Sequence, residues 1–214
     1  NIQGIDVDDF GNVYVCGYYH QTMNLGGIST PASISNTADI FVAKLSVTGE
    51  WLWVKTAGST NSDYCYDIDV DKGGNVSITG IYYGSIQFGS DSHSSSGSYD
   101  IFVALLDTSG NWIWSETVGA SSSDYAHGVA LAESGNVYVT GYWSSGSLNF
   151  GSAGSITCGS CYSDAFLASL DSQGNWRWVE RIGGSYYERG RSVAVDAQER
   201  VYVTGEFSYN VEFS

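Results

Sequence analysis

The chain has 214 residues and a formal net charge of −15, from eight basic and 23 acidic side chains. Such a surface repels phosphate backbones and anionic headgroups, so we expect no nucleic-acid partner and no membrane insertion. Hydrophobic residues make up 43% of the sequence, which is enough to bury a sizeable core.

The first 60 or so residues predict two β-hairpins. Residues 5–8 alternate apolar and polar side chains, and a turn over residues 9–12 leads into a second strand over residues 13–16. A loop rich in Gly, Ser and Thr separates this hairpin from a strand over residues 39–45 and another over residues 50–55. The first part of the chain is therefore expected to form four antiparallel strands.

The same order of segments returns along the chain with a period of about 60 residues. A glycine closes the second strand of each unit, at Gly17, Gly80, Gly141 and Gly205. We expect three complete units, at residues 1–65, 66–126 and 127–190, and the first half of a fourth at residues 191–214. Window by window, no segment keeps the helical period, so almost no helix is expected.

A unit of four antiparallel strands has the length and content of one blade of a β-propeller. We therefore predict an all-β propeller made of four-stranded antiparallel blades, about three and a half of which are present in the chain. A segment of a longer propeller explains the half unit more simply than a ring of two chains, which would lack strands at each seam. The remaining blades would come from a longer chain or from another subunit.

A pair of tryptophans opens the fourth strand of each complete unit, at Trp51/Trp53, Trp112/Trp114 and Trp176/Trp178. Residues i and i+2 of a strand share a face, so we expect both members of each pair to fill the wedge between one blade and the next. The alternative is an exposed aromatic platform for sugars.

The repeat resembles the seven-bladed β-propeller repeat family, often called SBBP. The resemblance rests on Asp-x-x-Gly-Asn-x-Tyr-Val-Thr-Gly, best kept at residues 136–141, and on Asp-x-Phe-x-Ala-x-Leu at residues 39–45, 100–106 and 164–170. It covers nearly the whole chain and implies a secreted or surface-attached bacterial module without common catalytic residues. Cys16 departs from the usual Thr, and residues 197–200 depart from the usual turn of the fourth unit.

Two sets of acidic residues are expected on the face that carries the loops between strands two and three and between blades. One set precedes the third strands, at Asp39, Asp100 and Asp164, and the other lies between units, at Asp63, Asp124 and Glu188. Such carboxylates could bind Ca²⁺. Their recurrence in every unit favours a structural role as acceptors of backbone N–H groups, so no cofactor is expected beyond this calcium alternative.

Residues that differ between units at one equivalent position are better candidates for a binding site, because the scaffold does not dictate them. The position that opens the first strand holds Gln3, Tyr66, His127 and Arg191. We expect it near the central channel, where these side chains could bind an anionic or polar ligand. An acid or base role for His127 is the alternative.

The four cysteines allow two disulfides. Cys158 and Cys161 lie close together in a Ser- and Gly-rich loop, where a local disulfide is expected. Cys16 and Cys65 could pair across two blades if the geometry permits. Neither thioredoxin-like chemistry nor a zinc site has the sequence context it needs.

The sequence therefore predicts a non-catalytic binding or architectural module with a protein or glycan partner on the loop face. A propeller-based glycan hydrolase or lyase with a loop-face site is the alternative. Because no apolar stretch of about 18 residues and no leader is present, we expect neither a membrane span nor a signal peptide in this sequence. The disulfides and the family resemblance favour a secreted or cell-surface location.

Overall fold

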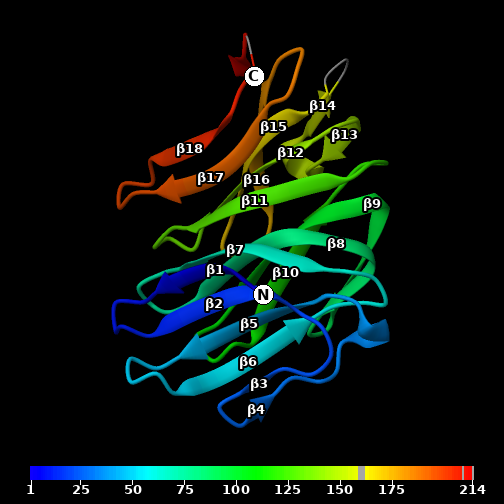
Figure 1. The fold of residues 1–214 in the computed structure, drawn as a ribbon. Helices are drawn as coiled ribbons and strands as arrows, with labels where there is room; N and C mark the ends of the chain where they lie inside the picture. The colour runs from blue at the N-terminus through cyan, green and yellow to red at the C-terminus, as the bar shows by residue number, and fades with distance from the viewer. Residues whose placement is uncertain (159–161, 209, 214) are drawn as a thin grey trace.

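The computed structural model describes residues 1–158, 162–208 and 210–213. It is an all-β chain in which four-stranded antiparallel sheets follow one another as the blades of a propeller (Figure 1). The predicted fold class is confirmed.

Each of the first three blades contains four strands in chain order, and the sheet of blade 3 gains a fifth strand at its edge. Blade 1 consists of β1 Ile2–Val7, β2 Val13–Tyr19, β5 Asp39–Leu45 and β6 Trp51–Ala57. Blade 2 consists of β7 Tyr64–Val70, β8 Val76–Phe88, β9 Asp91–Leu106 and β10 Trp112–Val118. Blade 3 consists of β11 Asp124–Leu131, β12 Val137–Trp143, β15 Asp164–Leu170 and β16 Trp176–Gly183. The hairpin of β17 Arg189–Val195 and β18 Val201–Glu206 forms half of a fourth blade.

The connection between the second and third strands differs from blade to blade. It carries a short hairpin in blades 1 and 3, formed by β3 Asn24–Leu25 with β4 Ile28–Ser29 and by β13 Gly146–Asn149 with β14 Ser155–Cys158. Short 3₁₀ turns accompany both hairpins, η1 at Ile34–Asn36 and η2 at Gly151–Ala153. In blade 2 the strands β8 and β9 themselves extend into this region.

The last strand, β19 at Glu212–Phe213, pairs with β16 on the outer edge of blade 3. This placement differs from the expectation that residues 191–214 form one fourth unit. A bare outer strand exposes unpaired backbone groups, and β19 satisfies part of that edge.

Aspartates close the turns within the blades. In each case the side chain accepts hydrogen bonds from backbone N–H groups later in the same turn, for example from Asn111 N to Asp107 Oδ1 at 2.8 Å. The same arrangement is found at Asp8, Asp71, Asp171 and Asp196. The Asp-x-x-Gly-Asn pattern is therefore a structural device that fixes tight turns.

Carboxylates also connect the first strands of neighbouring blades. Asp6 of β1 accepts a hydrogen bond from Val70 N of β7 at 2.8 Å, and Asp69 of β7 accepts one from Leu131 N of β11 at 2.6 Å. Because these strands do not belong to one sheet, side-chain acceptors supply a part of the bonding that a ladder would otherwise provide. The innermost strands are thus held in a fixed order around the axis.

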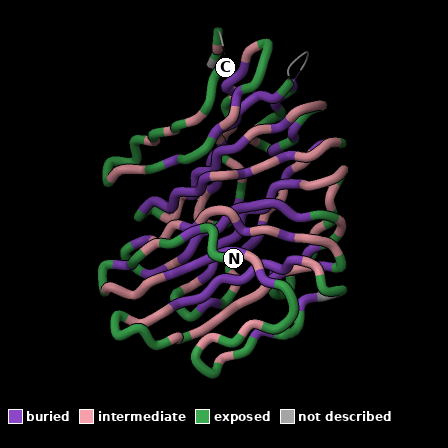
Figure 2. The backbone as a smooth tube through the Cα atoms, in the orientation of Figure 1, coloured by how far each residue is buried: buried purple, intermediate pink, exposed green. Residues whose placement is uncertain are grey.

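Most of the apolar core lies in the wedges between blades. One buried cluster lies between blades 1 and 2, a second between blades 2 and 3, and a smaller one between blade 3 and the half blade. A further cluster around Val15 and Phe41 lies on the face of blade 1 that no other blade covers. Figure 2 shows these buried segments running through the middle of the sheets. The wedge packing fixes how neighbouring blades are placed, and so fixes their loops as well.

The tryptophan pairs are core residues, but the two members of a pair do not fill the same wedge. A β-bulge lies between them in all three blades, so that Trp112 stands opposite Leu106 and Trp114 opposite Leu105. Adjacent partners face opposite sides of a sheet. Trp112 therefore packs on the cluster between blades 1 and 2, and Trp114 belongs to the cluster between blades 2 and 3.

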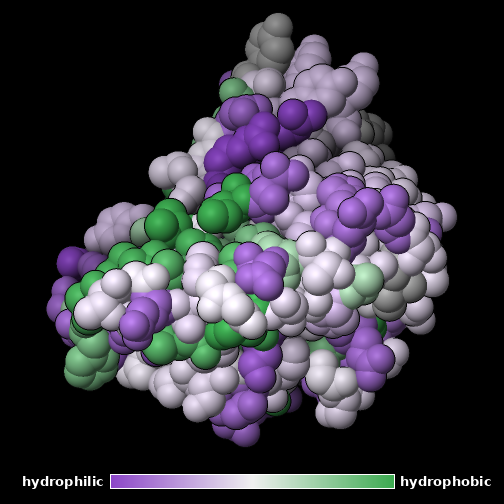
Figure 3. Space-filling view, turned by 60° about the horizontal axis from the view of Figure 1, so that its bottom comes forward, coloured by the Kyte–Doolittle hydropathy of each residue, from purple (hydrophilic) through white to green (hydrophobic). Residues whose placement is uncertain are grey.

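One face of blade 1, called here the open face, is not covered by another blade; its side chains are buried at β2 and β5 but exposed along β1. Ile5 of β1 is 66% exposed, whereas the equivalent Ile68 of β7 and Val129 of β11 are only 4% and 3% exposed, because each of these contacts the preceding blade. Figure 3 shows hydrophobic residues gathered on the face of the molecule that comes forward from the bottom of Figure 1, where blade 1 lies.

No helix in the described residues is long and apolar enough to cross a membrane.

Candidate functional site

The four residues predicted at the variable position are the β-bulges of the first strands. In β1, β7, β11 and β17 the pairing with the second strand skips one residue, and the skipped residues are Gln3, Tyr66, His127 and Arg191. A bulge removes a residue from the ladder and redirects its side chain. The bulge therefore takes this side chain out of the packing of the blade in each repeat, which is why its residue type can vary.

The structure brings the two aromatic bulge residues together and places an arginine close to them. The rings of Tyr66 and His127 stack with their centroids 5.3 Å apart. Arg191 lies near enough for its charge to act on His127, and its guanidinium pairs with Glu206 at 2.9 Å. Gln3 is exposed on β1, and among the described residues no hydrogen bond or ring contact links it to this group.

Around the bulge residues, further rings form one continuous aromatic surface, which we call the tyrosine band. Its ring-to-ring contacts include Tyr18 with Tyr64 at 4.8 Å and Tyr125 with Tyr142 at 4.9 Å. The band consists of Tyr18, Tyr64, Tyr66, Tyr83, Tyr99, Tyr125, His127 and Tyr142. All except Tyr83, which is exposed, are half-buried, so the rings are held in place while part of each stays accessible.

The band was not predicted from the sequence, although its pattern is visible in the repeats. Tyr18 and Tyr142 follow the glycine that closes the second strand, and Tyr64 and Tyr125 follow the acidic residue between blades. Arg189 takes the latter position in the next repeat, and its guanidinium lies 4.9 Å from the centre of the Tyr142 ring. The signal was missed because these tyrosines belong to two different positions of the repeat that meet only in space.

The environment of the band shifts the pKa values of two of its members, His127 and Tyr66. Burial lowers the pKa of His127 to about 4, and the charges of Arg191 and Arg189 act in the same direction. Burial and the neighbouring tyrosines raise the pKa of Tyr66. His127 Nε2 is buried and has no hydrogen-bond partner among the described residues. The site is thus an aromatic surface with two arginines at one end, suited to stacking and cation–π contacts.

Members of the two acidic sets lie close to each other in the structure. Asp63 N donates to Ala38 O at 2.7 Å, and Glu188 N donates to Ser163 O at 2.9 Å, so each linker acid lies beside the start of a third strand. The first set, Asp39, Asp100 and Asp164, is buried in three different blades. Within the described residues, no group of three or more His, Cys, Asp or Glu side chains could hold a metal ion.

The buried acids serve as acceptors within the scaffold. Ser96 N donates to Asp100 at 2.7 Å, and Ala120 N donates to Asp124 at 2.6 Å. Burial raises the pKa of Asp63 and of Asp124 to about 7 each, and the nearby Asp39 and Asp100 carboxylates add to the respective shifts.

Cys16 and Cys65 are close together but are not joined. Both are buried free thiols in the cluster between blades 1 and 2, so the disulfide considered for them is absent. Burial, with a hydrogen bond to Cys16, raises the pKa of the Cys65 thiol. The disulfide predicted between Cys158 and Cys161 involves residue 161, which lies outside the described residues, and it stays a prediction.

Comparison with known proteins supports the fold. No family model matches the chain. An uncharacterized WD repeat-containing protein of Acanthamoeba polyphaga mimivirus is 24% identical over 209 residues, which covers 84% of this chain and 15% of the relative. The chain thus spans only a small part of that protein's length. Together with the sheet topology, the similarity shows a repeat of the β-propeller type.

Proposed function

We propose that the chain is a binding module that presents the tyrosine band to a segment of a partner protein. The observation that carries this proposal is that the bulges of β7 and β11 hold Tyr66 and His127 at the variable position, and that these two rings lie within a half-buried aromatic surface. Tyrosine offers a large, rigid and amphipathic contact area at a low cost in conformational entropy, which is why protein-binding surfaces are rich in it.

A glycan is the second ligand class that this surface suits, because sugar rings also stack on aromatic side chains. The WD repeat-containing relative supports a binding or scaffold role without naming a ligand. The resemblance to the SBBP repeat supports placing the module outside the cell or on its surface, and this location is part of the proposal.

A catalytic role for His127 has less support. Its lowered pKa makes it a weak base, and its Nε2 has no hydrogen-bond partner among the described residues. General acid–base catalysis by histidine usually depends on a second group that orients the ring.

We also propose that the open face of blade 1 packs on a further blade, from elsewhere in a longer chain or from another subunit. The equivalent faces of blades 2 and 3 are covered in this way. The exposed apolar side chains of β1 support the same kind of contact.

The binding proposal is tested by selecting ligands on the purified chain from a phage-displayed random peptide library and, in parallel, from a glycan array. We expect enriched peptides that lose at least tenfold in affinity for Tyr66→Ala and His127→Ala, because stacked aromatic residues dominate such contacts. The control Tyr162→Ala removes an exposed tyrosine outside the band. Ligands that bind all three variants equally well would contradict the proposed site, and enrichment of glycans alone would reassign its ligand class.

A further inference from the structure

Blade 3 contains an internal ion pair at the end of its fourth strand. Arg181 of β16 donates from Nε to Asp164 Oδ2 at 2.7 Å. The Asp164 carboxylate is fully buried, and the Arg181 side chain is 24% exposed. The guanidinium therefore neutralises a buried carboxylate from the solvent side.

The equivalent residue is a threonine in blades 1 and 2. Arg181 stands opposite Phe166 in the ladder, and the matching pairs are Thr56 with Phe41 and Thr117 with Phe102. A threonine side chain is too short to take the place of the guanidinium and carries no charge. The buried acids of these blades, Asp39 and Asp100, are nevertheless kept.

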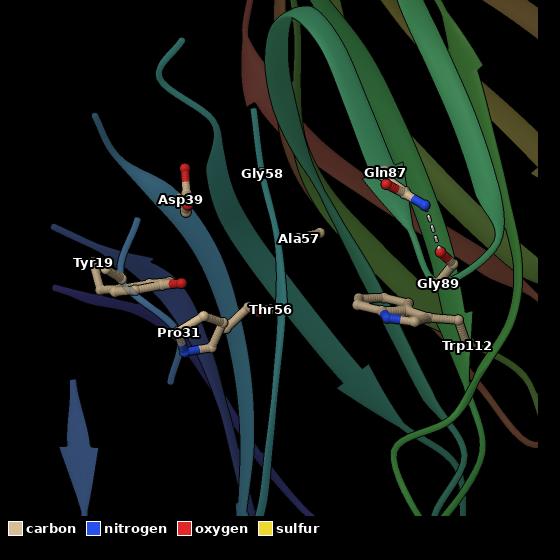
Figure 4. Close-up of a pocket in the computed structure, with 10 residues that line it drawn as sticks. Tyr19, Pro31, Asp39, Thr56, Ala57, Gly58, Gln87, Gly89 and Trp112 are labelled. Atoms are coloured by element: carbon tan, nitrogen blue, oxygen red, sulfur yellow. Dashed lines mark hydrogen bonds between the residues drawn. The ribbon is translucent and has the colours of Figure 1, made fainter. Parts of the chain in front are cut away.

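A pocket opens at this place in both blades. The pocket of blade 1 has a volume of about 440 Å³ and is lined by Asp39, Thr56 and Gly58, with Tyr19 and Trp112 among its other walls. In Figure 4 Tyr19 and Asp39 lie on one side of it and Trp112 on the other, with the end of β6 between them.

The pocket of blade 2 has the matching set of lining residues and a volume of about 330 Å³. Asp100, Thr117 and Gly119 line it in the places of Asp39, Thr56 and Gly58. In both blades the glycine is required, because a Cβ at Gly58 or Gly119 would collide with the aspartate carboxyl group. None of the residues that line the two pockets belongs to the tyrosine band.

The carboxylate of the blade 2 pocket lacks part of its hydrogen bonding. Asp100 is 2% exposed, and its Oδ2 accepts a bond from Ser96 N, whereas its Oδ1 is buried without a hydrogen-bond partner among the described residues. Asp124 nearby also leaves Oδ1 without a partner there. Unsatisfied buried carboxylate oxygens are costly, and a cation that donates hydrogen bonds removes that cost.

We propose that the pockets at Asp39 and Asp100 each accept a guanidinium group, which takes the place that Arg181 fills in blade 3. Guanidinium suits a buried carboxylate because it is planar, always charged and donates several hydrogen bonds in a fixed geometry. The rings of Tyr19 and Trp112 in the blade 1 pocket offer additional cation–π surface. The group could come from an arginine side chain of a partner protein or from a small free guanidine compound.

The test is a calorimetric titration of the whole chain with N-acetyl-arginine amide, and with N-acetyl-citrulline amide as the neutral isostere. We expect two sites for the arginine compound and at least tenfold weaker binding of the citrulline compound. The same titration is then repeated with agmatine and with an arginine-containing peptide. Tighter binding of the peptide assigns the pockets to a protein partner, and tighter binding of agmatine assigns them to a small molecule.

Substitutions that exchange threonine and arginine between the blades make the test specific. Thr117→Arg should fill the blade 2 pocket from within and reduce the number of sites from two to one, and Thr56→Arg should do the same for blade 1. Arg181→Thr should open a third site. Thr48→Arg, which adds the same charge at an exposed turn, is the matched control and should leave two sites. Equal affinity for the arginine and citrulline compounds, or two sites remaining in Thr117→Arg, would overturn the proposal.

Discussion

At the residue scale, the molecule uses aspartate and glutamate carboxylates in several distinct ways. Some close turns, some connect the first strands of neighbouring blades, and some lie where the linker between blades meets the third strand. Only the turn and scaffold roles could be inferred from the sequence, because recurrence in every repeat indicates a structural requirement. The pairing of Asp164 with Arg181 could not be inferred, since the spacing of a single arginine does not reveal its partner.

Because burial raises the pKa values of several aspartates, we expect an unusual dependence of stability on pH. The folded-state pKa of Asp124 is raised to about 7 by burial, well above the ordinary value for aspartate, so the folded protein holds a proton that the unfolded chain has already released. Stability should therefore fall as the pH rises from about 4 to about 7, by an amount on the order of a few kcal/mol for such a group. Asp63 and Asp69, whose pKa values burial likewise raises to about 7, act in the same direction.

Thermal melts of Asp124→Asn between pH 4 and pH 8 would check this expectation. The variant should lose less stability than the wild type over that range, because its side chain has no charge to bury. Asp9→Asn, at an exposed position, serves as the control and should follow the wild-type curve. A variant curve parallel to the wild type would show that Asp124 is already ionised at low pH.

At the scale of elements, β-bulges decide where the important side chains point. One bulge in each first strand presents the variable position, and one in each fourth strand separates the two tryptophans onto opposite faces. The repeat period and the alternation of side chains predicted the strands correctly. They could not show an extra residue in the ladder, so the prediction that both tryptophans fill one wedge was wrong. The tyrosine band was missed for another reason, because its members come from different positions of the repeat.

The second tryptophan of each pair should stabilise the contact with the following blade. Trp114 Nε1 donates to Ser172 O in the turn between β15 and β16 at 3.1 Å, and Trp53 makes the matching bond to Thr108 O. Trp114→Phe should cost about 1–2 kcal/mol in the free energy of unfolding, through the lost hydrogen bond and a small cavity. Urea denaturation measures this cost.

Trp178→Phe is the matched control for that measurement. Trp178 occupies the same place in blade 3 but has no carbonyl acceptor among the described residues. Its replacement should cost clearly less than that of Trp114. Equal costs would show that the bond between the tryptophan and the next turn adds nothing to the packing.

At the scale of the whole molecule, three blades and a half blade form a curved stack whose two ends differ. At one end β1 exposes Ile5 and Val7, and at the other end Tyr202 of β18 is 53% exposed. Internal blades cover the equivalent apolar positions, so the ends of the stack are surfaces of the same kind as the internal wedges.

Replacing Ile5 and Val7 together by serine should leave stability nearly unchanged, because surface substitutions usually alter it by no more than about 0.5 kcal/mol. The double variant should associate less at high protein concentration, as measured by light scattering. Ile68→Ser, at the covered equivalent position, should cost at least ~2 kcal/mol. If the double variant were destabilised as much as Ile68→Ser, the face of blade 1 would not be open.

The most direct test of the proposed binding module is amide hydrogen exchange of the chain with and without a peptide selected on it. We expect slower exchange in the bound state at the bulges of β7 and β11, around Tyr66 and His127, with little change in the turns between the third and fourth strands. Slower exchange confined to β1 and the open face of blade 1, with the bulges of β7 and β11 unchanged, would contradict a ligand site on the tyrosine band.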